Sequence, residues 1–147
     1  MPILSENDLK VALVNGSILY FSCLELNTPE PHYFVLVAVN DAGIYHLTCA
    51  TSQLATIQRL INKNKFPEAT FVWCPASDNT TPFTLDSFLN CNEYFEFWLY
   101  ELWQLYQAGD LQLRGVLPDD YYHQVIHGYH TSDMIEEEVK EILPPIN

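Results

Sequence analysis

The sequence predicts an α+β fold, in which a small β-barrel of five or six mostly antiparallel strands carries one inserted helix and further C-terminal helices. Short β-branched and aromatic runs, separated by turn signals, favour a small barrel over repeated strand–helix–strand units. Segments with helical periodicity gather late in the chain, as is typical of the α+β class. The 147 residues fit a single domain, with the barrel over about residues 8–92 and the helical part over about 93–147.

The first predicted strands lie on either side of a proline-bearing loop. Residues 17–24 are rich in β-branched and aromatic side chains and predict a strand. Residues 27–31 contain two prolines, which cannot serve a central ladder, and predict a loop. Residues 32–39 form the most strand-like run of the chain.

A hairpin follows this run. Residues 40–43 read as a four-residue hairpin loop, in which Gly43 is free to take a positive φ. The chain then returns through residues 44–50, which are again strand-like. We therefore expect the strands on both sides of this loop to pair in an antiparallel register.

The periodicity changes after the hairpin. Residues 52–64 place apolar side chains at spacings of three and four, which predicts an amphipathic helix with Ser52 as its N-cap. Residues 71–75 predict another short strand, and a polar loop follows over 76–82. Residues 85–91 alternate weakly and predict a further strand.

The C-terminal third is more apolar and more helical. Residues 94–108 are apolar or aromatic at most positions, which predicts a short strand near 94–97 and then a buried helix. Residues 111–117 predict an edge strand. Pro118 suits the first turn of a helix that reaches about Tyr129.

A capping-box pattern predicts the last helix. Asp133 and Glu136 have the spacing in which an N-cap side chain and the third helical residue bond each other's backbone. The helix that they open is expected to end at about Leu143.

Charge is the strongest feature of the composition. The formal net charge is −13, and residues 81–147, with two basic and twelve acidic side chains, carry −10 of it. Such a chain repels phosphate backbones at long range and is steered toward cationic partners. The alternative is an acidic surface that serves solubility alone.

The four cysteines do not form a metal or redox motif. Their spacings of 26, 25 and 17 residues lack the close pairs of a zinc knuckle or a C-x-x-C motif. Each lies in apolar, strand-like sequence, so we expect buried and reduced core residues. No run approaches the roughly 20 apolar residues of a membrane helix, and the N-terminus has no secretory pattern. A cytoplasmic protein without a membrane partner is expected.

Standard catalytic motifs are absent from the sequence. It contains no P-loop, no G-x-G-x-x-G, no H-E-x-x-H and no G-x-S-x-G. This absence argues against nucleotide binding and against the commonest hydrolase chemistries.

Three histidines recur at helical spacing. His123, His127 and His130 lie at i, i+4 and i+7, one turn after Asp119 and Asp120, and such ligands suit zinc. A straight helix, however, spreads three successive ligands along its axis rather than around one point. The favoured interpretation is a half-exposed aromatic face shared with neighbouring tyrosines, and no metal or other cofactor is predicted.

Two polar clusters are candidates for phosphate contact. Arg59, Lys63 and Lys65 lie on or beside the predicted helix, where Arg59 and Lys63 share a face, and a solvated helix face is the favoured interpretation. Thr51 and Ser52, at the end of a predicted strand, offer hydroxyls for a phosphate or an oxyanion. Their alternative role is to cap the following helix.

The order of these segments resembles the PemK/MazF-type toxins over roughly residues 15–90. The resemblance rests on the Gly16-Ser17-Ile18-Leu19-Tyr20-Phe21 strand, the proline-bearing loop, the 32–37 strand, the hairpin and Thr51-Ser52-Gln53. The family pattern has aspartate where this chain has Ser17, and arginine and proline where it has His32-Tyr33. The resemblance implies a small dimeric barrel that either cuts single-stranded RNA without a metal or is a catalytically degenerate relative of such enzymes.

Roles follow from the resemblance at the matching positions. Thr51 and Ser52 are expected to hold the attacked phosphate, and His32 to take the charged role and to transfer protons. Gln53, Arg59 and Lys63 are the expected substrate contacts, because the helix that carries the two cations is the main basic segment of an acidic chain.

A second hypothesis is a non-catalytic module that binds a basic protein partner. The acidic C-terminal third carries more aromatic side chains than one helix needs, which suits a partner or dimer interface. They are Tyr94, Phe97, Trp98, Tyr100, Trp103 and Tyr106.

Overall fold

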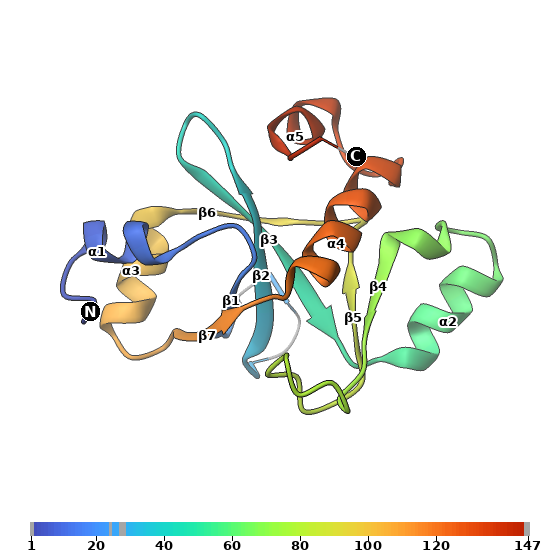
Figure 1. Ribbon diagram of the computed structural model, residues 1–147, viewed down its shortest axis with the longest axis horizontal. Coiled ribbons are helices and arrows are strands. Elements are labelled where there is room, and N and C mark those ends of the chain that lie inside the picture. Colours follow the sequence, from blue (N-terminus) through green and yellow to red (C-terminus); the bar gives the residue numbers. More distant parts are fainter. Residues whose placement is uncertain (1, 24, 27–28, 146–147) are drawn as a thin grey trace.

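The computed structural model describes residues 2–23, 25–26 and 29–145 (Figure 1). Strands and helices alternate irregularly, as expected for an α+β chain. In chain order the elements are α1 (Glu6–Ala12), β1 (Ser17–Phe21), β2 (His32–Val39), β3 (Ile44–Thr51), α2 (Leu54–Asn62), the short 3₁₀ turn η1 (Glu68–Thr70), β4 (Phe71–Cys74), β5 (Ser87–Asn90), β6 (Phe95–Trp98), α3 (Leu99–Gln107), β7 (Gln112–Val116), α4 (Asp119–Thr131) and α5 (Glu137–Ile142).

The strands form one antiparallel sheet with the order β4-β5-β3-β2-β1-β7. Strand β3 changes partner along its length, because β6 pairs with its first half and β5 with its last two residues. Strands β6 and β7, predicted near residues 94–97 and 111–117, join the sheet from the C-terminal part of the chain. The α+β class and the antiparallel strands are confirmed.

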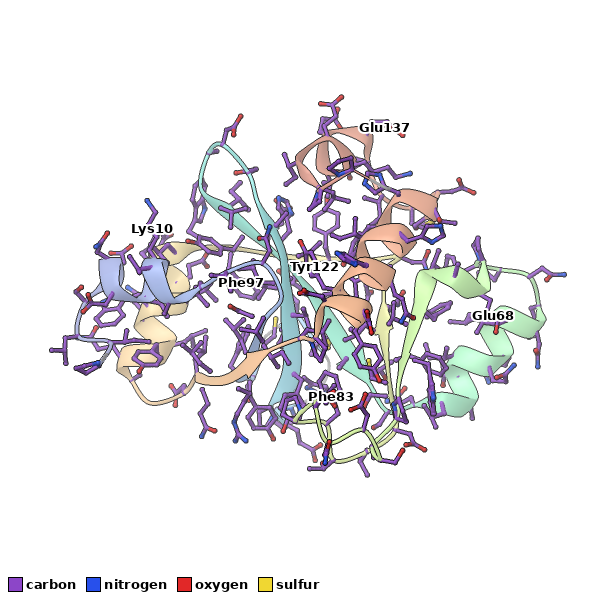
Figure 2. The ribbon with its side chains drawn as sticks, viewed as in Figure 1. Lys10, Glu68, Phe83, Phe97, Tyr122 and Glu137 are labelled. Carbon is purple, nitrogen blue, oxygen red and sulfur yellow. The ribbon has the colours of Figure 1, made fainter. Side chains whose placement is uncertain are left out.

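The barrel itself is not closed. Among the described residues seven strands pair, rather than five or six, and no pairing joins β4 to β7 at the two ends of the order. Helix α4 packs against β4, η1 and β2, so a helix rather than a strand pairing lies between these parts of the sheet (Figure 1). The Tyr122 hydroxyl of α4 donates to the backbone oxygen of Val37 in β2 over 2.8 Å (Figure 2).

Two hydrophobic clusters lie on opposite faces of β2. Val35 and Val37 belong to the cluster that includes residues of α4 and α5, whereas Phe34 and Leu36 belong to the cluster that includes residues of α1 and α3. Because successive strand residues point to opposite faces, a strand buried on both sides has a continuous apolar sequence. This explains why residues 34–38 are all buried.

Several local predictions need correction. Helix α2 begins after Gln53, which makes no side-chain cap, so Ser52 is not the N-cap. Helix α5 begins after Glu136, again without a side-chain cap, so the capping box at Asp133 does not form. The sequence reading also missed helix α1, whose N-cap Ser5 accepts a hydrogen bond from the Asp8 backbone N–H over 3.1 Å.

The four cysteines are confirmed as buried, unpaired core residues. Burial raises the pKa of the Cys49 and Cys74 thiols to about 12. In the described part of the chain, no helix has both the length and the apolar character needed to cross a membrane.

Candidate functional site

A cavity of about 350 Å³ lies where β2 begins and β3 ends. His32, Thr51, Ser52 and Gln53 all line it. The antiparallel register pairs Phe34 of β2 with Cys49 of β3, so the start of one strand lies beside the end of the other. The structure thus brings together four of the six site residues expected from the sequence.

The hydrogen bonds of His32 orient its imidazole ring. Its Nδ1 lies 2.9 Å from the backbone oxygen of Glu30. Because a carbonyl oxygen only accepts, this contact assigns the hydrogen of the neutral ring to Nδ1. The side chain is half-buried, and Glu30 lines the same cavity.

Thr51 shapes the turn between β3 and α2. Its Oγ1 accepts a hydrogen bond from the Gln53 backbone N–H over 3.2 Å. This bond fixes the turn of Thr51, Ser52 and Gln53 at the cavity, but it does not cap α2, because Gln53 precedes the first helical residue. The Thr51 hydroxyl keeps its own hydrogen, which it can donate to a bound anion.

A second cavity, of about 370 Å³, shares a wall with the first. The residues that line both are His32, Ala50, Thr51 and Gln53. Glu93 lines only the second cavity, and the sequence reading did not single it out. Desolvation by neighbouring groups raises the pKa of the Glu93 carboxyl, although part of the side chain stays exposed. A carboxyl and an imidazole therefore both line the second cavity.

The backbone of Glu93 is held by the C-terminal helices. The Tyr129 hydroxyl of α4 donates to the Glu93 backbone oxygen over 2.7 Å. The preceding residue, Asn92, donates through Nδ2 to Thr70 Oγ1 over 2.8 Å and accepts from Ser132 Oγ over 2.7 Å. Because Asn92 is buried and bonded to both Thr70 and Ser132, the backbone of the next residue, Glu93, has little room to move.

The cations of α2 are not part of either cavity. Arg59 and Lys63 are exposed, whereas the α2 residues that line the second cavity are Thr56, Ile57 and Leu60. The reason is the helical period: Ile57 and Leu60 face the sheet, and Arg59 and Lys63 face away from it. The expected substrate contacts at these two positions are therefore not brought to the site.

A row of aromatic rings lines the first cavity instead. The ring centroids of Tyr20 and Tyr33 are 4.5 Å apart, and those of Tyr33 and Phe83 are 5.3 Å apart with nearly perpendicular planes. Figure 2 shows Phe83 in the long connection between β4 and β5, beside the start of β2. At the other end of the row, the Cζ atom of Arg114 lies 5.1 Å from the centroid of the Tyr20 ring.

Sequence reasoning missed Arg114 because its neighbours depend on strand pairing. Residues 111–117 were expected to form an edge strand, and β7 is one, since it pairs only with β1 among the described strands. Neither its partner nor its register could be read from local sequence. The register pairs Gln112 with Tyr20, and this places Arg114 beside that ring.

The α4 histidines do not converge on one point. Helix α4 runs without a break, but His130 Nε2 lies 3.0 Å from the Pro144 backbone oxygen, whereas His123 and His127 are exposed beside a shallow cavity of about 320 Å³. In the described residues, no group of three or more histidine, cysteine, aspartate or glutamate side chains has the arrangement of a metal site.

No protein-family model matches the chain, and neither does any curated protein. The resemblance to PemK/MazF-type toxins therefore stays a prediction that rests on the segments quoted above.

Proposed function

We propose that the protein is a metal-independent endoribonuclease that cuts single-stranded RNA at the wall shared by the two cavities. The observation that carries this proposal is the convergence of His32, Thr51, Ser52 and Gln53 on one cavity. The segments that resemble the PemK/MazF-type toxins supply the same residues, so geometry and resemblance support one site. In this proposal the protein is the toxin of a toxin–antitoxin pair, a cytoplasmic protein and a homodimer with a PemK-like fold.

The reaction needs a base, an acid and groups that stabilise a phosphorane. The Glu93 carboxylate removes the proton from the ribose 2′-hydroxyl, whose oxygen attacks the adjacent phosphorus. The bond from phosphorus to the 5′-oxygen breaks, and the His32 imidazolium protonates that oxygen as it leaves. The products are a 2′,3′-cyclic phosphate and a 5′-hydroxyl.

The hydroxyls at the end of β3 serve the transition state. Thr51 and Ser52 donate hydrogen bonds to the phosphate oxygens, on which negative charge grows as the 2′-oxygen attacks. The His32 imidazolium adds a positive charge at the same wall. Gln53 holds the substrate through its amide group.

RNA cleavage in EDTA tests the proposal. A long single-stranded RNA is incubated with the purified protein, with His32→Ala and with His123→Ala. The last variant removes the same side chain from an exposed position of α4, far along the chain from the cavity. We expect the wild-type protein and His123→Ala to cut the RNA and His32→Ala to leave it intact. RNA that stays intact over a wide range of wild-type concentration would refute the proposal.

A different cavity favours a second candidate function, the binding of a basic protein partner. A cavity of about 430 Å³ between β1, β6 and α3 is lined by Phe21 and Phe97, with the carboxylates of Glu25 and Glu101. Phe97 was among the aromatic residues expected at such an interface. Aromatic faces and carboxylates together suit a lysine or arginine side chain.

Charge-matched variants test this second function. Binding of an arginine-rich peptide is measured by calorimetry for the wild-type protein, Glu101→Gln and Glu141→Gln. The two variants change the net charge equally, but only Glu101 lines the cavity. A specific site predicts loss of affinity in Glu101→Gln alone, and equal loss in both variants would show that only the overall charge matters. Light scattering on the same samples measures whether the protein is a dimer.

A further inference from the structure

The row that runs from Arg114 through Tyr20 and Tyr33 to Phe83 is fixed by the pairing of three strands. Strand β1 lies between β2 and β7, and Tyr20 is paired with Tyr33 on one side and with Gln112 on the other. Tyr20, Tyr33 and Phe83 all line the cavity that holds His32. The row therefore extends the candidate site from the start of β2 across β1 to β7.

The members of the row differ in exposure. Phe83 is buried, with 3 % of its surface exposed, and it supports Tyr33 from the side of the core. Tyr20 and Tyr33 are half-buried, so each has ring surface that faces the cavity. Arg114 is exposed, and its guanidinium Nε donates to Gln112 Oε1 over 2.9 Å.

This arrangement matches the chemistry of single-stranded nucleic acid. Bases stack on aromatic rings without strong preference for their sequence, and a nearby cation follows the phosphate backbone. Arginine has five N–H donors in a fork that fits phosphate. Gln112 engages only part of that fork, so the guanidinium is oriented and still has donors to offer.

The overall charge makes the position of each cation important. With a net charge of −13, a long phosphate chain is repelled at a distance, and binding depends on local contacts. Arg59 and Lys63 line neither cavity beside His32, whereas Arg114 lies against a ring that lines one of them. Arg114 is therefore better placed than the α2 cations to contact a strand bound at His32.

We propose that Tyr20 and Tyr33 stack bases of the single-stranded RNA bound at the His32 cavity, and that Arg114 contacts a phosphate next to those bases. The inference rests on the proposed function for the identity of its ligand. It concerns binding rather than cleavage, so the two can be tested apart.

The experiment measures binding of a fluorescent 2′-O-methyl oligonucleotide, which lacks the attacking hydroxyl and cannot be cut. Fluorescence anisotropy gives the Kd for the wild-type protein and for Arg114→Gln, Tyr20→Leu and Tyr33→Leu. Lys10→Gln on α1 controls for the loss of one positive charge, and Tyr100→Leu on α3 controls for the loss of an exposed ring. Arg59→Gln tests the α2 helix as the alternative path of the strand.

We expect the Kd to rise about five-fold or more in each variant of the row and less than about two-fold in the two controls. Binding by the wild-type protein that is unchanged in Arg114→Gln and Tyr20→Leu overturns the inference, even if the protein cuts RNA. Loss of binding in Arg59→Gln but not in Arg114→Gln, or no binding at all, overturns it as well.

One pattern of results separates this inference from the proposed function. If the row variants lose binding and natural RNA is nevertheless not cut by the wild-type protein, the binding row stands and the proposed reaction fails. Should Tyr33→Leu not fold, Arg114→Gln still decides the outcome, because the Arg114 side chain is exposed and its replacement leaves the core intact.

Discussion

His32 and Thr51 line the same cavity although 18 residues separate them, because β3 runs back along β2 and ends beside the start of that strand. The register that pairs Phe34 with Cys49 carries both residues to one end of the sheet. His32 thus supplies an ionisable ring at a strand start, and Thr51 supplies a hydroxyl at a strand end. The proposed chemistry depends on this meeting.

Thr51→Val tests the hydroxyl in this pair. The substitution keeps the branched shape and removes the donor to the phosphate, so we expect cleavage to fall by about 10- to 1000-fold. Thr131→Val on α4 removes a hydroxyl that bonds only within its own helix, to the His127 backbone oxygen, and serves as the control. Initial rates on one RNA measure the effect. Equal rates for Thr51→Val and the wild-type protein would exclude a role for this hydroxyl.

The pH dependence of cleavage tests Glu93. The base must be ionised, so activity is lost as the pH falls through the pKa of Glu93. Desolvation raises that pKa, so the acid limb should lie above the value of about 4.3 of an exposed glutamate.

The variant Glu93→Gln identifies the group responsible for the acid limb. It keeps the size of the side chain and removes the titration, so we expect a much lower rate and no acid limb from this group. Rates of RNA cleavage between pH 4 and pH 9 provide the comparison. An acid limb that is the same in Glu93→Gln would assign it to another residue.

Buried His46 predicts a loss of stability in acid. Only 3 % of its surface is exposed, its Nδ1 has no hydrogen-bond partner among the described residues, and its ring lies 5.2 Å from that of Tyr94. Desolvation lowers its pKa, against the opposite influence of Glu96 and Glu136. The unfolded chain therefore binds a proton at a higher pH than the folded protein does. Stability from this group is complete above the unfolded pKa of about 6.5 and is lost as the pH falls below it.

His46→Phe provides the measurement for this effect. Phenylalanine keeps a ring against Tyr94 but does not titrate. Between pH 7.5 and pH 5.5, we expect the free energy of unfolding in urea to fall more in the wild-type protein, by on the order of 1 kcal/mol. Parallel falls in both proteins would show that other groups, such as the many carboxylates, account for the acid sensitivity.

Gly128 allows α4 to approach η1 and the neighbouring Cys91 closely. A Cβ atom added there would lie 2.8 Å from Cys91 Sγ and 3.0 Å from the Ala69 backbone oxygen. Gly128→Ala should therefore destabilise the protein by about 1–3 kcal/mol through overpacking. The double variant with Cys91→Ala removes the closest atom, so its destabilisation should be smaller than the sum of the two single effects. Simple additivity in urea unfolding would contradict a direct contact.

Local sequence was sufficient for the elements that carry His32 and Thr51. The apolar run of β2 and the turn signal at Gly43, whose φ is +89°, predicted the hairpin, and the structure has it. The same kind of reasoning separated β6 from α3 within one apolar stretch. These features depend on neighbours in sequence.

Features that depend on distant pairing were not predicted. Strand β3 pairs with β6 along its first half and with β5 at its last two residues. Nothing in the local sequence indicates these partners or shows that the sheet stays open. Arg114 reaches Tyr20 only through the register of β1 with β7. Glu93 lies in the connection between β5 and β6, and its local sequence does not show that it lines a cavity together with His32. Helix α1 was not predicted, because it is too short for its periodicity to stand out.

The most direct test of the central claim is the chemistry of the RNA ends. The wild-type protein is incubated in EDTA with a single-stranded RNA, and the masses of the fragments are measured by mass spectrometry. A second RNA, with one 2′-deoxy residue at the cut site, is treated in the same way. Attack by the 2′-hydroxyl predicts a 2′,3′-cyclic phosphate on one fragment, a 5′-hydroxyl on the other, and no cut at the deoxy position. Fragments with a 5′-phosphate and a 3′-hydroxyl, or cutting at the deoxy position, would contradict attack by the 2′-hydroxyl between Glu93 and His32.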